Sequence, residues 1–135
     1  MKKRHLVLVF FFQNIFYIFS FSQGYLKDTL FVESVSFNAT TIIRVTCPEF
    51  EQNFEKSIKI KILTNKDSLF NLDSFLNGVH YEKRNSEIDV RAKFIYVRKD
   101  CTRREICMSK FDIVVDGRLV RRNRRFWAYL KSMVK

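Results

Sequence analysis

Hydrophobic and polar residues alternate most regularly over residues 87–98 of the chain. Successive side chains of a β-strand point to opposite faces of the sheet, so this alternation predicts a strand with one buried and one solvated face. The apolar residues, which we expect in the core, are Ile88, Val90, Ala92, Phe94 and Tyr96. The polar residues, which we expect in solvent, are Asp89, Arg91 and Lys93.

Six further segments are rich in β-branched and aromatic residues and are bounded by turn residues, so we expect each to form a strand. One of them alternates isoleucine with lysine, which predicts that Ile58, Ile60 and Ile62 are buried. Asp116-Gly117 predicts a tight turn between the last two strands. The six segments are residues 29–37, 41–47, 57–63, 103–109, 111–115 and 118–121.

Apolar residues at helical spacing predict two helices. The first covers residues 67–77, with Asn65 or Asp67 as its N-cap and Gly78 just after its end. Its apolar face consists of Leu69, Leu72, Phe75 and Leu76.

The second helix covers residues 124–134, and Asn123 is its expected N-cap. Its broad apolar face includes Phe126, Trp127, Leu130, Met133 and Val134. Elsewhere, the spacing of Phe50 and Phe54 predicts a single helical turn that lies on the core.

The strands come in runs joined by short connections, in the order β-β-β-α-β-β-β-β-α. That order predicts an α+β fold, in which an antiparallel sheet of about six to seven strands carries two helices packed on one face.

The beginning of the chain has the layout of a secretory signal peptide. Three basic residues precede an apolar stretch, and Ser20 and Ser22 are the small residues of an expected cleavage site. The stretch is shorter than the ~20 apolar residues that a membrane-spanning helix needs, and Gln13-Asn14 interrupts it. We therefore expect a cleaved signal peptide, residues 1–22, and a single small α+β domain, residues 23–135. Retention of the leader as a membrane anchor is the alternative.

Export would place the three cysteines in an oxidising compartment, where thiols of small domains usually pair. We expect a disulfide between Cys47 and Cys107, with Cys101 near a hairpin tip as a free or intermolecular thiol. Cys101 could pair with Cys107 only if the register of the hairpin allowed it. The chain has no C-x-x-C or paired-histidine spacing, so we predict no metal site and no cofactor.

The chain is basic, with a formal net charge of +11, and its densest basic run lies near the end. Arginine suits forked contacts with phosphate or carboxylate, so this run could bind an anionic partner; a merely solvated surface is the alternative. Export, and the lack of aromatic residues interleaved for base stacking, argue against nucleic acid. The run consists of Arg118, Arg121, Arg122, Arg124 and Arg125.

Several short stretches together resemble uncharacterised small secreted proteins of the Bacteroidota. They are the Phe-rich leader ending in Ser22-Gln23, Val45-Thr46-Cys47 before Phe50-Glu51, Ile88-Asp89-Val90-Arg91-Ala92, and Ile106-Cys107 leading through Phe111 to Val115-Asp116-Gly117. The resemblance implies export and a single domain, and it implies no known activity.

We therefore expect an exported, periplasmic or secreted protein that binds an anionic protein, glycan or lipid surface without catalysing a reaction. No motif assigns catalytic residues. A small secreted hydrolase or thiol enzyme with a site built from dispersed residues is one alternative, and in it His80 or a cysteine would have to meet carboxylates. The second alternative is an envelope protein that is anchored in the membrane by its uncleaved leader. We expect membrane contact only in this case.

Overall fold

A computed structural model of the protein describes residues 27–84 and 87–135, so the expected signal peptide lies outside the described residues. Six strands in these residues form one antiparallel sheet in the spatial order β2-β1-β3-β4-β5-β6. The strands are β1 (Thr29–Ser34), β2 (Lys59–Leu63), β3 (Ala92–Val97), β4 (Arg103–Met108), β5 (Ile113–Val115) and β6 (Arg118–Leu119). The helices are α2 (Phe50–Phe54), α3 (Lys66–Asn77) and α4 (Arg124–Val134).

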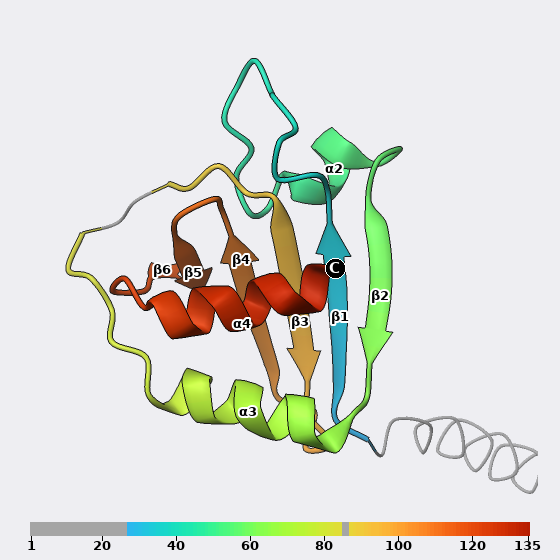
Figure 1. The fold of residues 1–135 in the computed structure, drawn as a ribbon, viewed down its shortest axis with the longest axis vertical. Coiled ribbons are helices and arrows are strands. Elements are labelled where there is room, and N and C mark those ends of the chain that lie inside the picture. Colours follow the sequence, from blue (N-terminus) through green and yellow to red (C-terminus); the bar gives the residue numbers. More distant parts are fainter. Residues whose placement is uncertain (1–26, 85–86) are drawn as a thin grey trace, which may run out of the picture.

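Helices α3 and α4 lie across one face of the sheet, as expected, and the α+β fold is confirmed (Figure 1). The main core lies between these helices and the central strands, where Val32 of β1 pairs with Phe94 of β3 and Phe94 pairs with Ile106 of β4. The helices contribute Leu69, Leu72, Leu76, Phe126, Leu130 and Met133 to this core.

Helix α4 begins at Asn123 as predicted, and of the two expected N-caps of α3 it is Asn65 that caps the helix, with Asp67 in the first turn. The side-chain oxygen of Asn65 accepts a hydrogen bond from the Ser68 amide at 3.0 Å, and that of Asn123 accepts one from the Phe126 amide at 3.0 Å. These bonds satisfy amide groups that have no partner within the first turn of a helix.

The turn between β5 and β6 also has its predicted conformation. Asp116 and Gly117 have φ angles of 49° and 76°, so both lie in the left-handed region that a tight two-residue hairpin requires. This turn directs the chain back along β5 and then into the arginine-rich segment before α4.

The strand expected over residues 41–47 is not formed. This segment belongs to a loop that projects beyond the sheet, and Ile42 and Ile43 are exposed (Figure 1). The physical reason is that β1 pairs with β2 along one edge and with β3 along the other, so no edge of β1 is free for a further strand.

The prediction that Ile60 and Ile62 are buried is wrong: both are exposed on the edge strand β2. Val32 pairs with Lys61, so it is Lys61 that shares the helix-covered face. Its ammonium group donates to the carbonyl oxygens of Met133 and Lys135, at 3.4 and 3.2 Å, at the end of α4. A lysine at the carboxyl end of a helix interacts favourably with the helix dipole.

The polar face predicted for residues 87–98 is wrong as well, because Arg91 and Lys93 are only 3% and 5% exposed. Helix α2 and the loop before it cover this part of the second face of the sheet and create a second core. Its buried residues are Val35, Val45, Phe50, Phe54, Ile88, Val90, Cys107, Val114 and Leu119. The single helical turn predicted at Phe50 and Phe54 is thus confirmed as the lid of this core.

Candidate anion-binding site

The arginine run is defined here as Arg118, Arg121, Arg122, Arg124 and Arg125, and it leads from β6 into the first turn of α4. All five side chains are exposed, and within the described ranges none has a carboxylate within 4.0 Å. Five other arginines each have such a partner: Arg44, Arg91, Arg98, Arg103 and Arg104. The positive charge of the arginine run is therefore left uncompensated by the protein.

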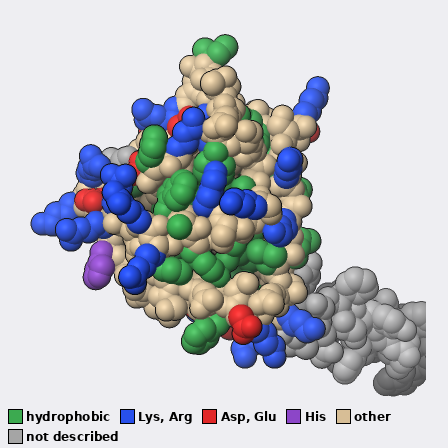
Figure 2. All heavy atoms as spheres, in the orientation of Figure 1, with side chains coloured by type: hydrophobic (Ala, Val, Ile, Leu, Met, Phe, Trp, Pro, Cys, Tyr) green, Lys and Arg blue, Asp and Glu red, His purple; other side chains and the backbone are tan. Residues whose placement is uncertain are grey.

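Two of these arginines occupy the beginning of α4, where the helix dipole is positive. The first turn of α4 contains no acidic residue, whereas the first turn of α3 contains Asp67. Arg124 and Arg125 at this position are unfavourable by roughly 0.3–1 kcal/mol each at a surface site. An anion bound beside them would offset that cost. Figure 2 shows Lys and Arg side chains gathered at this side of the molecule, near β6 and the start of α4.

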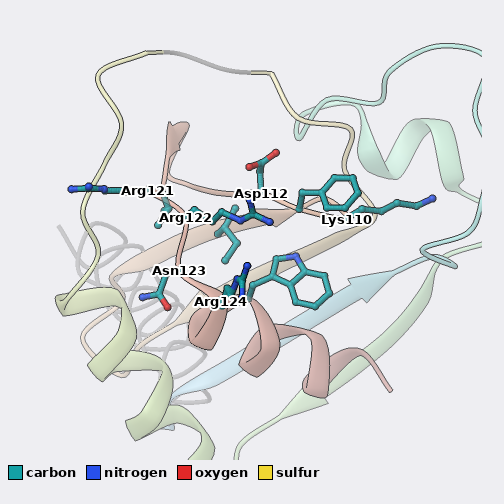
Figure 3. Close-up of a pocket in the computed structure, with 10 residues that line it drawn as sticks. Lys110, Asp112, Arg121, Arg122, Asn123 and Arg124 are labelled. Atoms are coloured by element: carbon teal, nitrogen blue, oxygen red, sulfur yellow. The ribbon is translucent and has the colours of Figure 1, made fainter.

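A hollow of about 290 Å³ lies between residues 110–113 and the start of α4 (Figure 3). Its apolar lining consists of Phe111, Ile113, Val120 and Trp127. Its polar lining consists of Lys110, Asp112, Arg121, Arg122, Asn123 and Arg124. We call it the Trp127 hollow.

The indole of Trp127 is fixed in the wall of this hollow, since its Nε1 donates a hydrogen bond to the Ser109 carbonyl oxygen at 3.3 Å. Figure 3 shows Arg122 and Arg124 extending toward the same space, while Arg121 and Lys110 extend away on opposite sides. The carboxylate of Asp112 points away from Arg124. The hollow therefore combines an apolar floor with cationic groups.

A second hollow, of about 350 Å³, lies on the other side of the same segment and is lined by His80 and by four of the arginines. The Arg121 amide donates to the His80 carbonyl oxygen at 2.7 Å, which joins the segment to the loop after α3. The described lining contains no carboxylate and no thiol beside His80. Arg118 lines neither hollow: its guanidinium carbon lies 4.0 Å from the centre of the Tyr81 ring, in a cation–π contact.

Cys47 and Cys107 lie at disulfide distance, with their Cα atoms 5.9 Å apart, as the sequence predicts. Cys101 is exposed at the turn between β3 and β4. The Glu105 carboxylate lies near both sulfur atoms of the pair, so these three residues have the proximity of metal ligands. A disulfide uses both thiols, however, and leaves only one carboxylate to bind an ion.

Sequence reasoning missed a group of charged residues around the buried Lys93 on the second face of the sheet. The Lys93 ammonium group lies 2.5 Å from Glu51 and 3.4 Å from Glu105. Burial would raise the pKa of Glu51, but the hydrogen bond and charge of Lys93, together with a backbone hydrogen bond and the charge of Arg103, outweigh it and lower that pKa. Burial, together with repulsion from Glu51, raises the pKa of Glu33, and the charge of Lys93 offsets only part of this rise. The group is packed under α2 and is separate from the arginine run.

Comparison of the chain with protein-family models, with characterised proteins and with solved structures found no match. The resemblance to secreted Bacteroidota proteins therefore stays a prediction. Within residues 27–84 and 87–135, no helix has the length and apolar character needed to cross a membrane.

Proposed function

We propose that this protein is an exported, non-enzymatic interaction protein that binds an anionic partner through the arginine run. The observation that carries the proposal is that all five arginines of the run are exposed and lack a carboxylate partner in the described residues. The exposed Arg84 also lacks one, whereas five other arginines of the same domain have such a partner. Unpaired guanidinium groups are available for forked contacts with carboxylate, phosphate or sulfate groups.

The shape of the surface supports the proposal, because four of the five arginines line hollows and do not stand isolated on a convex surface. Groups that line a concavity can contact one anion together, which gives more affinity than separate contacts. The excess of basic over acidic residues, which remains after cleavage of residues 1–22, would also speed the approach of an anionic partner by long-range attraction.

The location is proposed on separate grounds. Residues 1–22 have the pattern of a cleavable signal peptide, and a paired Cys47–Cys107 is a bond that persists in oxidising compartments. Both features favour the periplasm or the cell exterior. The partner would then be an anionic protein, glycan or lipid surface in that compartment.

Binding to immobilised heparin, a dense anionic glycan, tests the arginine run. We expect the affinity to fall about tenfold or more between roughly 0.05 and 0.3 M salt, because salt screens contacts between exposed charges. The double substitution Arg121→Ala/Arg122→Ala should weaken binding at least about tenfold, since it removes charge-assisted contacts.

The matched control is Arg44→Ala/Arg103→Ala, which removes the same charge from two exposed arginines that have carboxylate partners. This control should weaken binding far less. Equal weakening by both double variants would mean that heparin senses only net charge, and binding indifferent to salt or to Arg121→Ala/Arg122→Ala would refute the proposal.

A further inference from the structure

We propose that the Trp127 hollow binds a small amphiphilic anion, in which an apolar chain or ring carries a single carboxylate or other acidic group. This inference rests on the proposed anion binding and adds the class of ligand that the hollow would accept.

The floor of the hollow is apolar. Ile113 and Val120 are buried and continue into the main core, while Trp127 is half-buried and fixed by its bond to Ser109. Phe111 stands at the edge of the hollow with 69% of its surface exposed. An apolar ligand group lying on this floor would cover Phe111 and Trp127 and remove their surface from water, which is favourable.

The cationic groups specify the charge of the ligand. Arg122 and Arg124 extend toward the same space, and neither has a carboxylate partner in the part of the chain that the structure describes (Figure 3). Asp112 is the one acidic residue in the described lining, and its carboxylate points away from Arg124. A cationic ligand would be repelled, and an uncharged ligand would leave both guanidinium groups without a counter-ion.

The size of the hollow limits the ligand. A volume of about 290 Å³ is at the lower end of the range for small-molecule sites, which is roughly 300–1,000 Å³. With about 30 Å³ for each water-sized group, it accommodates on the order of ten non-hydrogen atoms. Octanoate has this size and combines the two required chemical features.

Octanoate is therefore the probe, and Trp127 is the reporter, because the chain contains one tryptophan. Titration of the purified protein with octanoate should change the tryptophan fluorescence in a saturable manner. Octanol has the same chain without the charge, and acetate has the charge without the chain. We expect each to bind at least about tenfold more weakly, since each loses one of the two interactions.

Two substitutions with matched controls locate the site. Phe111→Ala should weaken octanoate binding about fivefold or more, whereas Phe70→Ala, at an equally exposed phenylalanine of α3, should leave it unchanged. Arg122→Gln/Arg124→Gln should weaken octanoate binding and abolish the preference over octanol, whereas the exposed Arg103→Gln should not.

Failure of this inference is distinguishable from failure of the proposed function. If heparin binding depends on Arg121 and Arg122 but octanoate binds no better than octanol, the ligand class is wrong and the arginine proposal stands. If Phe111→Ala and Phe70→Ala weaken octanoate binding equally, the ligand lies elsewhere and the inference is overturned. If octanoate binds as expected but heparin binding ignores the arginines, the proposed macromolecular partner is wrong.

Discussion

The Lys93 ammonium group contacts Glu51 and Glu105 although only 5% of the residue is exposed. The charge is tolerated because carboxylates surround it, and these carboxylates are themselves partly open to solvent. Arg91 follows the same rule, since its guanidinium group bonds both carboxylate oxygens of Asp89, at 2.8 and 2.6 Å. At the scale of single residues, the second face of the sheet is thus held by paired charges as well as by apolar contacts.

Glu33 is the residue of this group for which ionisation is unfavourable, and it yields a prediction about pH. Its pKa is raised in the folded protein by burial and by repulsion from Glu51. The stability that its protonated form contributes is therefore present below the pKa of an unfolded glutamate and is lost as the pH rises through the raised value. Glu33→Gln keeps the side chain neutral, so this variant should gain stability over the wild type as the pH rises from about 4 to 7.

Urea unfolding at several pH values checks this prediction. Glu55→Gln is the control, because Glu55 is an exposed glutamate without an ion pair among the residues described. A variant Glu33→Gln that becomes less stable than the wild type toward neutral pH would show that ionised Glu33 supports Lys93.

Among the elements, the β5–β6 turn requires a positive φ angle at Gly117. Gly117 has φ 76°, and a Cβ atom added there would meet no heavy atom within 4 Å. Substitution therefore acts through the backbone conformation alone. Gly117→Ala should lower the free energy of unfolding by about 1 kcal/mol, because an L-residue is strained at positive φ.

Gly78 provides the matched comparison. It follows α3 with φ −99°, and an added Cβ would meet the Ser74 carbonyl oxygen at an ordinary 3.5 Å. Gly78→Ala should be neutral or slightly stabilising, because alanine restricts the unfolded chain. Urea unfolding of both variants measures the two changes in the free energy of unfolding. Equal destabilisation by Gly117→Ala and Gly78→Ala would show that the positive φ of Gly117 is not the cause.

The elements that sequence predicts well are those whose signals are local. Asn65 and Asn123 mark helix starts, Asp116-Gly117 marks a hairpin, and each acts on neighbouring residues only. The exposure of Ile60 and Ile62 depends instead on the register in which β2 pairs with β1. The alternation of isoleucine and lysine does not show which of these two groups of residues faces the core. The strand predicted over residues 41–47 is wrong for a similar reason, because its strand-like composition does not show that both edges of β1 are already paired.

In the whole molecule, the Cys47–Cys107 pair joins the loop before α2 to β4 and so holds the second core against the sheet. The two residues are separated by 60 positions. In the chain-entropy model, closing a loop of this length stabilises the folded state by about 4 kcal/mol. Cys47→Ser/Cys107→Ser should lose stability of this order.

Unfolding with and without dithiothreitol measures the contribution of this pair. The reductant should destabilise the wild type and the control Cys101→Ser, and it should have no effect on the double variant. A wild type whose stability is unchanged by the reductant would show that the two thiols are not bonded.

The candidate site was predictable only in part. The arginine run is visible as a charge cluster, but Arg118 turns to Tyr81 while the others line hollows, and this separation depends on the bridge between Tyr81 and Val120. Phe111 and Trp127 meet in one hollow because β5, β6 and α4 fold back on one another, and no spacing in the sequence brings them together.

The position of β1 between β2 and β3 has a consequence for how the chain folds. The β3–β4 hairpin closes a short connection, whereas β1 can pair with β3 only after the chain has passed through α2, β2 and α3. Since closing a long loop costs more entropy than closing a short one, we expect the hairpin to form early and the β1–β3 pairing to limit the folding rate. Until then β1 and β3 each keep an unpaired edge, and in that interval we expect the protein to be most prone to aggregation.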